Sequence, residues 1–146
     1  MSLLDNDLIE INIYYKYIKE NNMKKIIILE DEKAKNILEN GTDTEKKEIE
    51  VLKTKWGNLT WKEQNDISEI SAKVINPQTG ERRFNFISYR DAIVKKCLKE
   101  WNLTINEKPA PLTPDSIDRL PGSIVISLYQ KFEAFIDYTD KELGNC

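Results

Sequence analysis

The chain has 146 residues, of which 40% are hydrophobic, and this length suffices for one domain that folds without a disulfide or a metal. Its 22 basic and 25 acidic residues give a net charge of −3, which argues against a general nucleic-acid-binding protein. The sequence contains no histidine, and this excludes Ser-His-Asp and Cys-His catalysis and a histidine-ligated zinc site.

The first part of the chain predicts an appendage, residues 1–54, of α or α/β character. The β-branched run 24–29 predicts a short strand, and residues 30–40 predict a helix that stops at Asn40-Gly41. Residues 48–56 alternate in part and predict a strand or an extended segment. A helix is expected over about residues 4–20, because apolar residues recur there at helical spacing: Leu8, Ile11, Tyr14, Tyr15 and Ile18.

From residue 55 onward the helix signals are stronger. Thr60 and Glu63 match the capping box S/T-x-x-E, which predicts a helix over residues 61–73. The turn sequence Asn-Pro-Gln-Thr-Gly that follows predicts a hairpin between residues 73–76 and 82–87.

Three more helices are expected in the last third of the chain. Ser88 is the expected cap of a helix over 89–101. Thr113-Pro114 predicts a short helix over 114–120, and Leu120-Pro121 leads into a last helix over 122–140. We therefore expect a mainly α fold with few short strands, in which residues 55–146 form a small helical domain.

The two cysteines and the apolar runs bear on compartment. Cys97 lies within an apolar helical stripe, so we expect a buried, unreactive thiol, whereas Cys146 is expected to be exposed and reactive. The longest aliphatic run, residues 26–29, is far shorter than a membrane span, and no signal peptide is recognisable. These features favour a reducing, cytoplasmic location without membrane association.

The sequence offers few groups with catalytic chemistry. Asp115 and Asp118 are explained as acids that complement a helix dipole, and the acidic run 30–32 lacks the spacing of a calcium loop. No glycine-rich phosphate loop is present. We expect no enzyme, no cofactor and no metal. The segment 82–86 interleaves arginine with phenylalanine and leaves a nucleic-acid surface as an alternative.

The three tryptophans have two interpretations. Trp56 and Trp61 flank a turn, and Trp101 ends an expected helix. Tryptophans at the ends of elements commonly pin loops onto the core. Alternatively, they form an aromatic docking surface for a partner. The sequence alone does not separate these roles.

One segment resembles a known family. Residues 56–67 read W-G-N-L-T-W-K-E-Q-N-D-I and resemble the W-G-x-L-T-W-x-E-Q-N-x-I segment of tail assembly chaperones of tailed bacteriophages. Residues 89–101 resemble that family's second helix. Members of that family typically continue with a proline-rich linker, a helix that starts at Thr-Pro, and a Leu-Pro pair before the last helix. Here these features are matched by residues 109–111, residues 112–115 and Leu120-Pro121. The resemblance covers about residues 55–136.

The resemblance implies a non-enzymatic protein that binds the tape-measure protein and hands it over to the tail-tube protein in the cytoplasm of an infected cell. Two alternatives stay open: a structural virion component, such as a connector or tail-completion protein, and a nucleic-acid-binding regulator. The oligomeric state is also open. An apolar groove that covers a helical client is expected to use aromatic residues, and the candidates are Trp56, Trp61, Trp101, Tyr129, Phe132 and Phe135.

Overall fold

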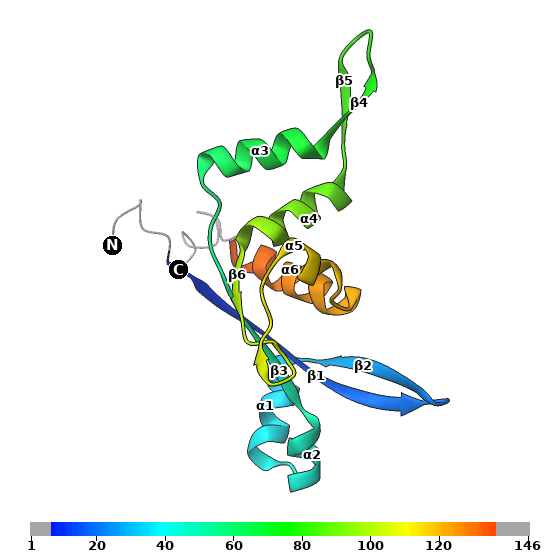
Figure 1. Ribbon diagram of the computed structural model, residues 1–146, viewed down its shortest axis with the longest axis vertical. Coiled ribbons are helices and arrows are strands. Elements are labelled where there is room, and N and C mark those ends of the chain that lie inside the picture. The colour runs from blue at the N-terminus through cyan, green and yellow to red at the C-terminus, as the bar shows by residue number, and fades with distance from the viewer. Residues whose placement is uncertain (1–6, 137–146) are drawn as a thin grey trace, which may run out of the picture.

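The computed structural model describes residues 7–136 and has a mixed α/β architecture (Figure 1). About 45% of the structure is helical and 33% is strand, and its largest sheet has four antiparallel strands. The expectation of a mainly α fold is therefore wrong. The four-stranded sheet has the order β2-β1-β3-β6 and is formed by β1 (Ile9–Glu20), β2 (Met23–Leu29), β3 (Glu50–Trp56) and β6 (Leu98–Trp101).

The N-terminal region contains a β-hairpin where a helix was expected over residues 4–20. The β-branched and aromatic residues that suggested a helical stripe also alternate with polar ones, and in β1 the sheet buries Ile11 and Ile13 on one face. Asn21 and Asn22 adopt φ angles of 52° and 64°, as a two-residue hairpin turn requires. Pairing with β2 and β3 thus outweighed the helical spacing, while the strand predicted at 24–29 is confirmed as β2.

Two helices connect β2 to β3. The predicted helix over residues 30–40 is confirmed as α1 (Asp31–Asn40), and it is followed by the short helix α2 (Asp43–Glu48). The segment predicted as a strand or extended lead-in is β3. The boundary predicted at residue 54 lies inside this strand, whose Leu52 and Trp56 belong to the same core as Ile13 of β1.

An arm of two antiparallel helices follows the sheet. It consists of α3 (Trp61–Ser71), the hairpin of β4 (Ala72–Asn76) and β5 (Glu81–Phe84), and α4 (Phe86–Cys97) (Figure 1). The capping box is confirmed: the Glu63 amide donates to Thr60 Oγ1 over 3.2 Å, and Glu63 Oε1 accepts from the Thr60 amide over 3.0 Å. The predicted hairpin is confirmed as well.

The second helix of the arm differs from its prediction at both ends. It begins at Phe86, because the side chain of Asn85 and not that of Ser88 is the cap; Asn85 Oδ1 accepts from the Ser88 amide over 3.2 Å. The helix ends at Cys97, since the next residues leave it to pair with β3 as β6. The apolar stripe that contains Cys97 therefore extends from the end of helix α4 into strand β6.

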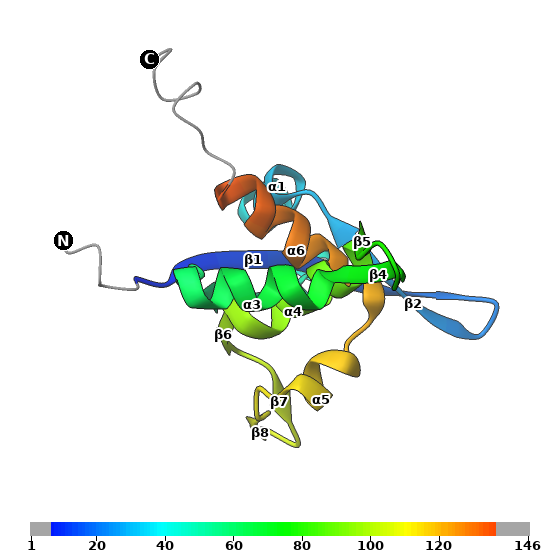
Figure 2. The ribbon, with the colours of Figure 1, turned by 90° about the horizontal axis from the view of Figure 1, so that it is seen from above.

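The remaining elements follow β6 along the chain. A small hairpin of β7 (Thr104–Ile105) and β8 (Lys108–Pro109) precedes α5 (Pro114–Asp118) and α6 (Gly122–Ile136). Thr113 caps α5 and Pro114 occupies its first turn, as predicted. The last helix packs along β1 (Figure 2). Its predicted continuation to residue 140 lies outside the described residues. Between residues 7 and 136, no helix has the length and apolar character to cross a bilayer.

Candidate functional site

A groove lies between α4 and α6 and is made of two adjoining hollows of about 450 and 200 Å³. The hollows adjoin each other, because Arg90 and Ile126 line both of them. We call it the α4–α6 groove. The larger hollow is lined by Phe86, Arg90, Ile126, Tyr129, Gln130, Glu133 and Ala134. The smaller one is lined by Ile87, Arg90, Asp91, Val94, Ile117, Gly122, Val125 and Ile126.

Local structure places the aromatic residues of the groove. The Asn85 cap starts α4 directly after β5, which brings Phe86 and Ile87 into the first turn of the helix. The Phe86 ring meets Tyr129 of α6 edge-on, with 6.0 Å between the ring centroids. The Arg90 guanidinium lies over the Phe86 ring, 5.5 Å from its centroid. Phe86 is therefore held by α6 on one side and by its own helix on the other.

The groove leaves apolar surface in contact with solvent. Ile87 is 69% exposed, Phe86 is 48% exposed, and Ile126 on the facing helix is also exposed. Exposed apolar residues gathered around a depression mark interaction sites more often than apolar residues scattered singly. The groove thus offers apolar contact area that no part of the described chain covers.

Charged groups at the rim complement this apolar floor. Arg90 and Glu133 both line the larger hollow. Burial, together with a hydrogen bond to Glu133, raises the pKa of Tyr129 above its ordinary value, so the phenol stays protonated. With Asp91 of the smaller hollow, the groove has one cation and two anions beside its apolar side chains, which suits an amphipathic peptide helix.

Three of the predicted contact residues are buried. Trp56 is fully buried and stacks on Phe132, with ring centroids 4.7 Å apart. Its indole Nε1 donates to Thr54 Oγ1 over 2.7 Å, and Thr54 Oγ1 donates in turn to the Ile11 carbonyl. Tyr129 is also buried, although it lines the groove. Partner binding by Trp56, Phe132 and Tyr129 stays a prediction, beside the packing role seen for Trp56 and Phe132.

The other three candidates lie at separate places. Trp61 is 79% exposed at the first position of α3 and does not line the groove. Trp101 is half-buried in β6, and its Nε1 donates to the Ala110 carbonyl over 2.8 Å, which fastens the loop after β8. Phe135 is exposed near the end of α6. The structure therefore does not bring the predicted residues together into one surface.

The residues that sequence reasoning missed are Phe86, Ile87 and Ile126. The segment 82–86 drew attention only as alternating basic and aromatic residues, and Phe86 was expected in a strand. An exposed apolar residue in the first turn of a helix gives no periodic signal, because it departs from the buried stripe. Recognition of Asn85 as the cap would have placed Phe86 and Ile87 at the start of the helix.

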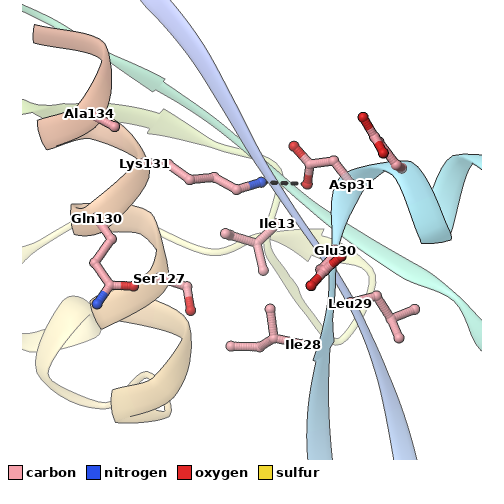
Figure 3. Close-up of a pocket in the computed structure, with 10 residues that line it drawn as sticks. Ile13, Ile28, Leu29, Glu30, Asp31, Ser127, Gln130, Lys131 and Ala134 are labelled. Atoms are coloured by element: carbon pink, nitrogen blue, oxygen red, sulfur yellow. Dashed lines mark hydrogen bonds and ion pairs between the residues drawn. The ribbon is translucent and has the colours of Figure 1, made fainter.

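A second cleft lies on the neighbouring flank of α6 and shares Gln130 and Ala134 with the larger hollow of the groove (Figure 3). Ile13 and Ile28 form its apolar floor, and Lys131 of α6 reaches across β1 toward Asp31 at the start of α1. The Lys131 ammonium also donates to the Asn12 carbonyl over 2.7 Å. Since β2 ends opposite Tyr14, this carbonyl lies where β1 has no strand neighbour on that side. Lys131 thus fastens α6 to the open part of the strand.

Two of the carboxylates considered in the sequence, Asp118 and Asp31, take part in ion pairs, and the pair of Asp118 fastens the arm to α5. Lys95 contacts Asp118 at 2.9 Å and Asp91 at 3.2 Å. The hydrogen bond to Asp118 is the main reason why the pKa of Lys95 is raised. Among residues 7–136, no three acidic or cysteine side chains are grouped so that they could hold a metal ion.

The thiol of Cys97 is buried, as predicted. Burial raises its pKa to about 12, which keeps it protonated and unreactive at neutral pH. Cys146 lies outside the described residues.

Comparison of the chain with protein-family models, with curated proteins and with solved structures returned no match.

Proposed function

We propose that the chain is a phage tail assembly chaperone that binds an apolar helical segment of the tape-measure protein in the α4–α6 groove. The observation that carries this proposal is the exposed apolar surface of Phe86, Ile87 and Ile126 around the groove. The resemblance of residues 56–67 to tail assembly chaperones supplies the identity of the client, and it is independent of the groove.

The shape and chemistry of the groove support a helical client. Two facing helices with a depression between them accept a third helix, whose apolar face then meets apolar side chains at spacings of three and four residues. Arg90 and Glu133 at the rim orient a client of complementary charge, and such contacts favour specificity more than affinity. A long, apolar tape-measure helix would aggregate if it stayed uncovered, so its coverage during assembly explains a chaperone.

Modest affinity at each groove is an advantage in this role. A chaperone that hands its client over to tube subunits must dissociate, and many weak contacts along one long client achieve both coverage and release. The shallow, partly polar groove fits weak binding per copy. The proposed place of action is the cytoplasm of the infected cell.

The proposal is tested by co-expression with the tape-measure protein of the same phage. We expect the client to stay soluble with the native chain and to precipitate with an Ile87→Asp variant, because a carboxylate placed in the groove must be desolvated when an apolar helix binds. Ile105→Asp is the matched control, since Ile105 is 62% exposed in β7 and lies outside the groove. A client whose solubility does not depend on the native chain would refute the proposal.

Purified virus particles separate the chaperone from a structural virion component. A chaperone is absent from the particle or strongly depleted, whereas a connector or tail-completion protein is present in fixed copy number. Quantitative mass spectrometry of the particles measures this difference. Stoichiometric presence would replace the chaperone proposal by the virion-component alternative.

A further inference from the structure

The two edges of the four-stranded sheet are built differently. At one edge, β6 has only four residues, and its pairing with β3 shifts register between Lys55 and Trp56. Short edge strands and bulges are common means by which proteins prevent a further strand from pairing. At the other edge, β2 has seven residues that pair with β1 without any register shift. Only the β6 edge is therefore protected in this way.

The outer side of β2 has no strand neighbour within the described chain. The β1–β2 hairpin projects from the rest of the molecule (Figures 1 and 2). The centre of β2 is Ile26-Ile27-Ile28, three half-buried residues without a charge or a proline between them. β2 is apolar from Ile26 to Leu29 and carries Lys24 and Lys25 in its first half. An apolar segment on an open edge is a template for pairing with another chain, whereas edge lysines oppose this pairing unless the other chain supplies acids.

The sequence of this edge is complementary to itself. When two copies of β2 pair antiparallel about a two-fold axis at Ile27, Ile26 lies opposite Ile28 of the second copy. In the same register Lys24 lies opposite Glu30. The backbone of Glu30 has φ −63° and ψ 143°, so the extended geometry of β2 continues to this residue. An isologous contact thus gives apolar pairs in the middle and two ion pairs at the ends.

The charges at both ends lack opposite partners within the described chain. Lys24 lies opposite Lys19 of β1, and like charges placed directly opposite each other are unfavourable. Its ammonium packs over the Tyr17 ring, 4.2 Å from the centroid. Across residues 7–136, none of the ion pairs includes Lys19, Lys24 or Glu30. A second copy would supply an acid to Lys24 and a base to Glu30.

We propose that two copies of this chain associate through β2, so that two four-stranded sheets join into one continuous sheet across a two-fold axis at Ile27. The partner is a second copy because its own edge carries the complementary charges in the complementary register. The two grooves of one dimer would bind neighbouring segments of a single client, which raises the effective affinity for that client. The dimer itself does not depend on the function proposed above.

A charge exchange tests the register. Sedimentation equilibrium of the purified chain between about 1 μM and about 1 mM measures the dimer dissociation constant. We expect Lys24→Glu and Glu30→Lys each to raise this constant by roughly tenfold, because two attractive pairs become repulsive. The double variant, which restores both pairs with reversed sign, is expected to dimerise as the native chain does. Lys25→Glu is the charge control, since Lys25 lies opposite Leu29 of the second copy in this register. This variant also removes the exposed ion pair with Glu20, so circular dichroism must confirm its fold.

Cross-linking tests the position of the axis without any change of charge. With Cys146 replaced by Ser, an Ile27→Cys variant places two thiols directly opposite each other, within the range in which disulfides form. Ile26→Cys places them two positions out of register. We expect rapid oxidative cross-linking for Ile27→Cys only, with circular dichroism confirming that both variants fold.

Three results would overturn the proposal. The first is a native chain that stays monomeric at the highest concentration. The second is a dimer that the double charge exchange does not restore. The third is equal cross-linking of Ile26→Cys and Ile27→Cys.

Discussion

The last helix, α6, presents apolar side chains to two different environments. Toward the sheet, Phe132 is almost fully buried and stacks on Trp56. Toward α4, Ile126 is exposed and adjoins Phe86 and Ile87 along the groove. The same kind of side chain thus stabilises the fold on one side and stays open to solvent on the other. Substitution of the buried residues is therefore expected to destabilise the fold, whereas substitution of the exposed residues is expected to remove a binding surface.

The largest expected effect lies on the buried side. Trp56→Ala removes a fully buried ring and leaves a cavity beside Phe132, so we expect a loss of about 3–5 kcal/mol in the free energy of unfolding. Urea denaturation followed by circular dichroism measures this loss. Phe86→Ala is the comparison variant, with an expected loss below about 1.5 kcal/mol, because its ring is half-exposed. Equal losses would show that the two sides of α6 do not differ.

The groove side is expected to show the reverse behaviour. Phe86→Asp should weaken binding of a tape-measure segment by roughly tenfold or more, because apolar contact area in the larger hollow of the groove is lost. Isothermal titration calorimetry with the native chain and the variant measures the change. Trp61→Ala serves as the control on an exposed aromatic outside the groove, and its binding should match that of the native chain.

The buried side of α4 carries the thiol of Cys97, which makes the free energy of unfolding depend on pH. Burial raises the pKa of Cys97 to about 12, above that of the unfolded thiol. The unfolded state therefore loses a proton first, and the stability due to this thiol is present below about pH 8.5 and falls as the pH rises toward 12. Between pH 8 and pH 10 we expect the native chain to lose about 2 kcal/mol more than Cys97→Ala does. Urea denaturation at each pH measures this loss. An equal loss of stability in the native chain and in Cys97→Ala would contradict a buried thiol.

The smallest expected effect concerns the ion pair that fastens α6 to the open part of β1. Lys131 and Asp31 are both partly exposed, so solvent screens their attraction. Lys131→Met should cost about 1 kcal/mol or less, mainly through loss of the hydrogen bond to the Asn12 carbonyl. Lys62→Met, which removes the exposed pair with Asp66, is the control and should change the urea midpoint even less.

Local signals in the sequence predicted the elements that local contacts determine. The capping box at Thr60 and Glu63, the cap at Thr113 and the turn between β4 and β5 all act within about five residues, and each is found where it was predicted. The sheet could not be predicted in this way, because Ile13 pairs with Leu52 and Thr54 with Trp101 across long stretches of chain. Such pairing turned an expected helix into β1 and ended α4 four residues early.

The site was less predictable than the fold. Tyr129 was a candidate and lines the groove, but the exposure of Phe86 and Ile87 follows from what fails to pack against them. The spacing of apolar residues in one sequence does not show whether another element packs against a given residue. Trp56 and Trp61 illustrate the same limit: they lie five positions apart in one motif, yet the first is fully buried and the second is 79% exposed.

The most direct test of the central claim is a titration of a helical tape-measure segment against the native chain, Ile87→Asp and Ile105→Asp. The two variants place the same charge at two exposed isoleucines, one in the groove and one in β7. We expect binding to the native chain and to Ile105→Asp with the same dissociation constant, and binding to Ile87→Asp weakened by tenfold or more. Equal binding by all three proteins would contradict the assignment of the groove as the client site.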